Sequence, residues 1–332
     1  MHGPVRFLGA LALVFTFSVA AAAEDSAGLR LGLIGCDTSH VIAFTSRFND
    51  PGNKNHVPGG KVVAAVKGGS PDIETSHTRV PEYTKTLVEK YGVTIHDDIS
   101  EMCRHVDAVL LTSLDGRPHL EQAKPVIAAG KPLFVDKPVA GSLQDAIELF
   151  RLAKEAGVPC FSSSSLRWYP GVVEVATADI GELRAAISYG PSPTEPHHPD
   201  LFWYGIHPTE ALFTVMGPGC ESVVRTSTGD AIVVTGTWSG GRVGTLHGIV
   251  NGKRGYKVTA FGTKGIAEQK SGGDYTPMLR EIITFFRTGK PPVPPETTLE
   301  IYAFMEAADE SKRRGGSRVT LAEVLEHNGR RP

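Results

Sequence analysis

The stretch Leu31-Gly32-Leu33-Ile34-Gly35 is a short apolar run that ends in glycine, and it predicts a buried β-strand. Thr38 or Ser39 follows where a helix needs its N-cap residue, and the helix is expected to reach about Asn49. A strand that leads through a short glycine turn into a helix is the basic unit of an α/β fold.

The same alternation continues along the first half of the chain. Further strands are expected at residues 61–66, 108–112, 132–136 and 159–162, and helices at residues 84–91, 118–129 and 142–156. Ser142 and Asp145 form a capping box at the start of the last of these helices. Strands separated by helices predict a parallel sheet with helices on both faces, which binds ligands at the carboxyl ends of its strands.

The second half follows a different pattern. Strands are expected at residues 183–189, 231–238, 243–250 and 256–262, and most of them follow one another with only glycine-rich turns between. We therefore expect an α/β domain over residues 28–165, followed over residues 166–326 by an α+β domain with a mainly antiparallel open sheet.

The overall composition is that of an ordinary globular protein. The chain of 332 residues has 34 Lys and Arg against 36 Asp and Glu, which gives a net charge of −2 and no footprint for nucleic acid. Its four cysteines form no C-x-x-C pair and are expected to be buried free thiols.

The first 23 residues have the pattern of a Sec-type signal peptide. Arg6 supplies a positive charge, residues 7–20 are apolar, and residues 21–23 are three alanines suited to signal peptidase. An uncleaved membrane anchor is the alternative, although the apolar stretch is short for a span. We expect a periplasmic or extracellular protein with no stable membrane insertion after cleavage.

Two motifs and their order carry a family resemblance. Asp136-Lys137-Pro138 follows a predicted strand, and Gly205-Ile206-His207-Pro208 with Glu210 lies in the second half. Together with the segment Arg287-Thr-Gly-Lys-Pro-Pro, this series resembles the Gfo/Idh/MocA family of glucose–fructose oxidoreductases and inositol dehydrogenases over about residues 29–324. The resemblance implies a Rossmann-like domain that binds NAD or NADP, a sugar or polyol substrate, and a homo-oligomer formed through the second sheet.

The resemblance also implies the catalytic residues. Lys137 matches the lysine of the family and would stabilise a developing alkoxide. His207 matches its histidine and would exchange the proton. The alternatives are a surface lysine paired with Asp136, and a capping or core histidine. His119 could line the nicotinamide side, although a histidine on a helix surface is the commoner case.

Further residues are assigned by position. The expected cofactor-binding residues are Gly35, Cys36, Asp37, Thr38, Ser39, His40, Lys67, Ser70, Thr112, Ser113, Asp136 and Lys137. The expected substrate residues are Arg167, Trp203, Tyr204 and Glu210.

The chain departs from the family at three places. Asp37 and His40 stand where the fingerprint G-x-G-x-x-G has its second and third glycines. Lys67 and Ser70 replace the acidic residue that usually holds the ribose, which slightly favours NADP. Trp203 stands where the family often has Asp. These departures leave a second hypothesis open, an exported carbohydrate-binding protein without redox activity.

A metal site is a third possibility. His197, His198, Asp200, His207 and Glu210 lie close together in the sequence, and His247 could approach them. No pair has the spacing of a metalloprotease, and we expect no metal there.

Overall fold

The computed structural model describes residue 3 and residues 28–329. The predicted signal peptide therefore lies outside the described residues, and it stays a prediction. No helix in the described part of the chain is long and apolar enough to cross a membrane.

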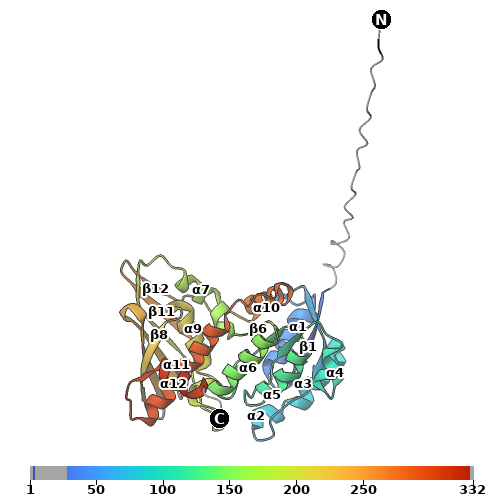
Figure 1. Cartoon of the computed structure of the whole chain (residues 1–332), viewed down its shortest axis with the longest axis horizontal. Coiled ribbons are helices and arrows are strands. Elements are labelled where there is room, and N and C mark those ends of the chain that lie inside the picture. Colours follow the sequence, from blue (N-terminus) through green and yellow to red (C-terminus); the bar gives the residue numbers. More distant parts are fainter. Residues whose placement is uncertain (1–2, 4–27, 330–332) are drawn as a thin grey trace.

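The first half of the chain builds a six-stranded parallel sheet in the order β3-β2-β1-β4-β5-β6 (Figure 1). Its strands are β1 (Leu29–Ile34), β2 (Gly60–Val66), β3 (Thr94–His96), β4 (Ala108–Leu111), β5 (Leu133–Val135) and β6 (Cys160–Ser162). The order reverses between β1 and β4, which places the topological switch point at the turn that begins with Gly35. The predicted Rossmann-like parallel sheet is confirmed.

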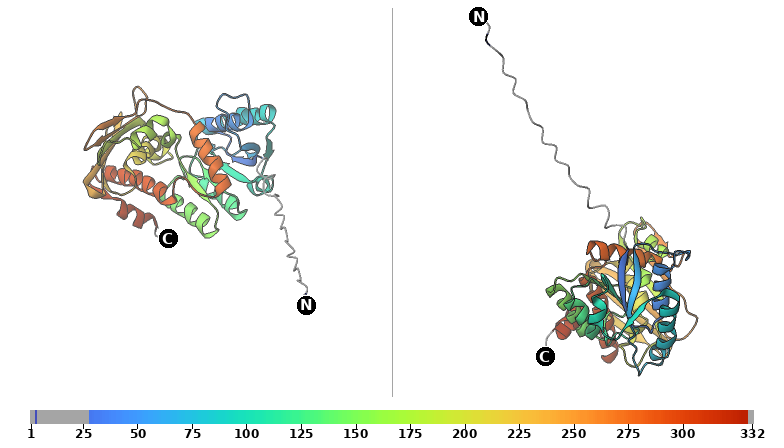
Figure 2. Two further views of the ribbon diagram at one scale, coloured as in Figure 1. Left: turned by 90° about the horizontal axis from the view of Figure 1, so that it is seen from above. Right: turned by 90° about the vertical axis from the view of Figure 1, so that its right-hand side faces the viewer.

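Helices cover both faces of this sheet. One core cluster joins it to α1 (Ser39–Asn49), α3 (Val80–Tyr91) and α10 (Thr276–Thr288). The other face carries α4 (Ile99–Cys103), α5 (His119–Ala128) and α6 (Leu143–Glu155), and the short α2 (Glu74–His77) lies before α3. Figure 2 shows α10, in orange, beside the blue and cyan elements, so the C-terminal part of the chain completes the core of the first domain.

Local signals explain most helix ends. Thr38 is the N-cap of α1, and the Ser142 side chain accepts a hydrogen bond from the Asp145 N–H, as the capping box predicts. Helix α3 starts at Val80, earlier than the expected residue 84, because Pro81 is tolerated in a first helical turn. The helix ends at Gly92, whose φ is +67°.

The second sheet has seven strands in the order β12-β11-β7-β10-β9-β8-β13. They are β7 (Leu183–Pro191), β8 (Cys220–Ser227), β9 (Ala231–Trp238), β10 (Arg242–Ile249), β11 (Lys257–Gly262), β12 (Ile266–Glu268) and β13 (Val319–Thr320). All neighbouring pairs are antiparallel except β7 with β10. The mainly antiparallel sheet is confirmed, and β8, β12 and β13 add to the strands that the sequence predicted.

Helices α9 (Ile206–Met216) and α11 (Pro295–Arg313) cover one face of the second sheet. Phe213 of α9 and Phe304 of α11 pack against Trp238 of β9. The other helical elements here are α7 (Pro170–Ala176), α8 (Asp200–Trp203), α12 (Leu321–Gly329) and the 3-10 turns at Ser165–Trp168 and Ser239–Gly241. All four cysteines are buried free thiols, as expected.

Candidate active site

The carboxyl edge of the first sheet meets the start of α9. The Ser164 hydroxyl, just after β6, lies 2.7 Å from Nδ1 of His207. The neighbouring Ser163 hydroxyl donates a 3.0 Å hydrogen bond to Glu210, one helical turn further along α9. The predicted residues of both domains are therefore brought to one place.

Lys137 and His207 are both buried at this junction. Nζ of Lys137 lies 5.3 Å from the centre of the Tyr204 ring, and the edges of the Tyr204 and Tyr256 rings approach His207. Burial lowers the pKa of Lys137. Burial, together with the nearby charge of Lys137, holds the pKa of His207 well below 6.5. The alternative of a surface lysine is wrong, because Lys137 is 7% exposed.

His40 and Asp136 form a buried ion pair that crosses the end of β4. Nδ1 of His40, in the first turn of α1, contacts Oδ2 of Asp136 after β5. The other carboxylate oxygen accepts a 2.8 Å hydrogen bond from the backbone N–H of Lys137. Burial alone would raise the pKa of Asp136, but His40 and Lys137 outweigh it and lower the pKa. The pair thus fixes the backbone from which Lys137 projects.

A second buried ion pair, between Arg167 and Glu210, joins the segment after β6 to α9. Nε of Arg167 donates a 2.6 Å hydrogen bond to Glu210, and Trp168 donates from its indole N–H to Ser163. Nη2 of Arg167 is buried without a hydrogen-bond partner among the described residues. Tyr204 contacts Lys137 and His207 directly, and the Arg167 and Glu210 pair lies one helical turn from His207 on α9.

The turn after β1 is built differently from the family fingerprint. A Cβ at Gly35 would lie 2.4 Å from Cα of Ser113, so the first position requires glycine. The Asp37 side chain is fully buried. It accepts a 2.6 Å hydrogen bond from the Ser76 hydroxyl and a 3.0 Å bond from the Leu114 N–H. Burial raises the pKa of Asp37 despite these donors. Asp37 thus bridges the segments that follow β1, β2 and β4.

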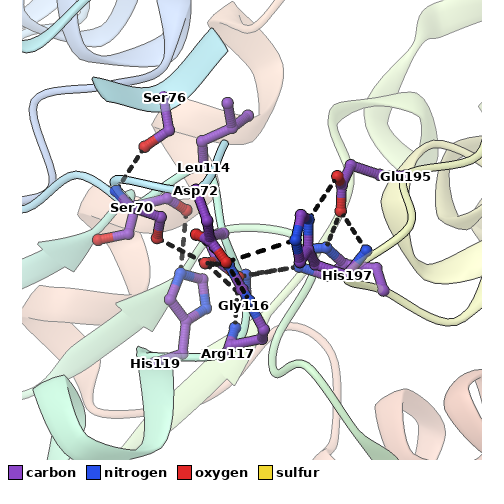
Figure 3. Close-up of polar contacts among 12 residues, drawn as sticks. Ser70, Asp72, Ser76, Leu114, Gly116, Arg117, His119, Glu195 and His197 are labelled. Carbon is purple, nitrogen blue, oxygen red and sulfur yellow. Dashed lines mark hydrogen bonds and ion pairs between the residues drawn. The ribbon is translucent and has the colours of Figure 1, made fainter. Parts of the chain in front are cut away.

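Beside this bridge lies a polar network, the Asp115 network, formed by Ser70, Asp115, Arg117 and His198. Figure 3 shows this region, with Ser70 and Arg117 labelled. Ser70 donates a 2.5 Å hydrogen bond to Asp115, and the Arg117 guanidinium binds the same carboxylate. Nε2 of His198, from the second domain, lies 3.0 Å from Asp115. Burial would raise the pKa of Asp115, but these partners outweigh it and hold the pKa far below its usual value.

Trp203 lies beside the loops that follow β2 and β4. It packs with Ile73, which precedes α2, and with Leu114 in the loop after β4. Its ring centre lies 4.9 Å from that of His198, and the residue is 8% exposed. The structure therefore places Trp203 in the contact between the domains, and Tyr204, which lies beside Lys137, packs against the same cluster.

The other predicted cofactor residues differ in their exposure to solvent. Ser39 and Lys67 are exposed at the rim. Cys36 faces the protein interior, where its backbone N–H donates to Lys67 and burial raises the thiol pKa to about 12. The Thr112 hydroxyl donates to the β1 backbone, and Ser113 donates to Gln122.

His119 has a structural role that the sequence did not predict. The side chain is fully buried. Its Nε2 lies 3.0 Å from the carbonyl oxygen of Ser113, and its Nδ1 lies 3.3 Å from that of Val139. Burial lowers the pKa of the ring. The residue joins the loops after β4 and β5, and it lies neither on the helix surface nor free beside the nicotinamide position.

The histidines and carboxylates considered as a metal site have different partners. His197 and His198 both contact Glu195, and His198 also contacts Asp115. Asp200 instead pairs with Arg225 and Lys312. They do not converge on one point, although they are close together in the sequence.

Sequence reasoning missed Ser76, Asp115 and Arg117. Asp115 and Arg117 lie in the loop after β4, and their position after a parallel strand was the only signal that could have indicated them. Ser76 belongs to a four-residue helix that the sequence did not predict.

Comparisons with known proteins agree with this description. Residues 29–164 match the family model GFO_IDH_MocA, described as "Oxidoreductase family, NAD-binding Rossmann fold". The predicted resemblance is confirmed for residues 29–164, which match the NAD-binding Rossmann model of the Gfo/Idh/MocA family. No curated protein sequence matches the chain.

Solved structures with the same fold cover nearly the whole chain. A probable dehydrogenase from Thermotoga maritima is 21% identical, with a TM-score of 0.72, and the match covers 89% of this chain and 100% of that one. A putative myo-inositol dehydrogenase from Sinorhizobium meliloti is 16% identical, with a TM-score of 0.71 and coverage of 88% and 99%. An oxidoreductase from Agrobacterium radiobacter, in complex with NAD+, L-tartaric acid and magnesium, is 16% identical, with a TM-score of 0.71 and coverage of 90% and 100%.

The carboxyl edge of the first sheet has two ends, and they fit a nicotinamide dinucleotide unequally. The nicotinamide end is formed by Lys137 and His207, and the phosphate end is formed by the turn from Gly35 to His40. At the nicotinamide end, Lys137 Nζ and His207 Nε2 make no hydrogen bond to any described residue, so both can meet a substrate. At the phosphate end, Asp37 adds a side chain where the fingerprint requires bare backbone. The residues of the nicotinamide end therefore fit the dinucleotide, whereas the Asp37 side chain occupies the place of the second fingerprint glycine.

Proposed function

We propose that this protein is an NAD(P)-dependent oxidoreductase that transfers a hydride between the nicotinamide and a carbinol carbon of a sugar, polyol or related polyhydroxy compound. The observation that supports it is the convergence of Lys137 and His207 at the carboxyl edge of an NAD-binding Rossmann fold. Neighbouring buried groups with shifted pKa values are typical of acid–base catalysis.

In this proposal the bound nicotinamide supplies the hydride chemistry. The Lys137 ammonium donates a hydrogen bond to the reacting oxygen and stabilises negative charge on it. In this proposal Nδ1–H of His207 donates its hydrogen bond to the Ser164 hydroxyl. Nε2 is then unprotonated, so it accepts the hydroxyl proton when the substrate is oxidised and returns it when the product is reduced. His40 and Asp136 hold the Lys137 backbone in position.

The side chains near Lys137 and His207 support the proposal of a polyhydroxy substrate. Tyr204 offers an aromatic face and a hydroxyl, and the Arg167 and Glu210 pair offers charged hydrogen-bonding groups. Structures of the same fold include a scyllo-inositol dehydrogenase from Lactobacillus casei, which supports a polyol class.

The test is a panel of sugars, sugar acids and inositols, each incubated with the protein and with NAD+ or NADP+. We expect saturable formation of reduced nicotinamide with at least one compound, and the same compound should raise the melting temperature. A compound that binds in the thermal assay without any nicotinamide reduction would contradict the proposal.

That contrary result would support a second function, carbohydrate binding without redox chemistry. The specific observation in its favour is the phosphate end, where the Asp37 bridge and the Trp203 contact fill the edge with the protein's own side chains. In that case neither NADH nor NADPH should bind, while the carbohydrate binds normally.

The remaining proposals concern export, the domain boundary and self-association of the protein. We propose that residues 1–23 direct export, and that the domains divide near residue 165. We also propose that the open face of the second sheet, with exposed Ile187, Tyr189, Val224 and Val243, joins copies of the chain. N-terminal sequencing of the secreted protein and light scattering test these proposals.

A further inference from the structure

A compact group of imidazole and carboxylate side chains lies at the β3 edge of the first sheet, where His96 pairs with Val66 of β2. His96 is the last residue of β3, Glu101 lies in α4, and His105 follows that helix. The ligand atoms of these three residues all lie within 4.8 Å of one another. The rings of His96 and His105 are nearly parallel, with centres 5.1 Å apart.

The geometry follows from the local fold. The spacing of four residues places Glu101 and His105 on the same side of the α4 turn, and Nε2 of His105 lies 3.1 Å from Oε1 of Glu101. Strand β3 pairs with β2 alone, so its end is free to approach α4 from the edge of the sheet. Three ligands thus come from two structural elements and the turn that follows α4.

We propose that His96, Glu101 and His105 form a binding site for a Zn²⁺ ion or a similar divalent transition metal. Two imidazoles and one carboxylate are a known zinc ligand set, and a water molecule would complete the tetrahedron. Tetrahedral zinc ligands lie about 3.4 Å apart, so small side-chain rotations close the present arrangement. The ion would join the edge strand β3 to α4.

The charges around the site both favour and oppose a cation. The Glu101 carboxylate favours a cation, and its Oε1 already faces Nε2 of His105. Arg104 pairs with Oε2 of Glu101, which leaves Oε1 on the side of His105. The positive charge of Arg104 repels a metal cation, so removing the Arg104 side chain should strengthen metal binding.

The experiment is a calorimetric titration of the tag-free, chelator-treated protein with ZnCl₂. We expect one Zn²⁺ per chain, with affinity more than about tenfold weaker in His96→Ala and in His105→Ala, because each removes a direct ligand. His327→Ala, which changes an exposed histidine on α12, is the matched control and should bind as the wild type does. Co²⁺ in place of Zn²⁺ should give a tetrahedral visible spectrum.

Two further variants keep the test decisive if a histidine variant folds poorly by circular dichroism. Arg104→Ala should tighten Zn²⁺ binding, and Glu101→Gln should weaken it. Equal Zn²⁺ affinity in the wild type and in the His96→Ala/His105→Ala double variant would overturn the proposal, as would weaker binding by Arg104→Ala. These readouts do not depend on the proposed oxidoreductase activity.

Discussion

The two ends of the first sheet's carboxyl edge have opposite characters. At the nicotinamide end, Lys137 and His207 are buried but keep polar atoms without hydrogen-bond partners among the described residues. At the phosphate end, Asp37 accepts hydrogen bonds from Ser76 and from the Leu114 N–H, and Asp115 accepts one from Ser70. A site that must meet a substrate leaves polar groups available, whereas a structural network satisfies them internally.

The largest expected effect tests the nicotinamide end. Lys137→Met should lower kcat/KM by about 100- to 1000-fold, because it removes the donor that stabilises the alkoxide. Thermal stability should stay equal or rise, since a buried amine without a hydrogen bond is replaced by an apolar group. Lys131→Met, on the turn after α5, is the control with unchanged kinetics. Normal turnover by Lys137→Met would remove the basis of the catalytic assignment.

The second prediction concerns the phosphate end. Asp37→Gly should restore bare backbone beside the pyrophosphate and tighten NADH binding by at least about tenfold, by fluorescence titration. It should also cost about 1–3 kcal/mol of unfolding free energy, because the buried Ser76 hydroxyl and Leu114 N–H lose their acceptor. Asp37→Asn keeps the size of the side chain and serves as the control. If Asp37→Gly binds NADH no better than Asp37→Asn, the bridge does not restrict the cofactor.

The sequence predicted the nicotinamide end better than the phosphate end, for a physical reason. Lys137 and His207 each sit in a motif whose position at a strand end or helix start can be inferred from local patterns. The contact of Asp115 with His198 joins two domains, and no local pattern encodes it. The packing of Trp203 against Ile73 and Leu114 is likewise a long-range contact that no local pattern predicts.

The third prediction is the pH dependence of kcat/KM for substrate oxidation. Burial lowers the pKa of His207 below 6.5, so the neutral base persists and the acid limb should fall below that value. Burial also lowers the pKa of Lys137 below 10.5, so activity should decline on the alkaline side before that pH, as the ammonium is lost. An acid limb above pH 6.5 would contradict the role given to His207.

The smallest expected effect concerns the choice of cofactor. Lys67 is exposed at the end of β2, where the adenosine ribose lies in Rossmann domains. Lys67→Gln should reduce the preference for NADPH over NADH by a few-fold, measured as the ratio of the two dissociation constants, because one charge near a 2′-phosphate is lost. An unchanged ratio would show that Lys67 does not contact the cofactor.

The most direct test of the central claim is a calorimetric titration of the wild-type protein and Asp37→Gly with NADH and NADPH. The account predicts saturable binding of one dinucleotide per chain in the wild type, with higher affinity in Asp37→Gly. The absence of binding by both proteins with both dinucleotides would contradict it and would leave a Rossmann domain that has kept its fold without its cofactor.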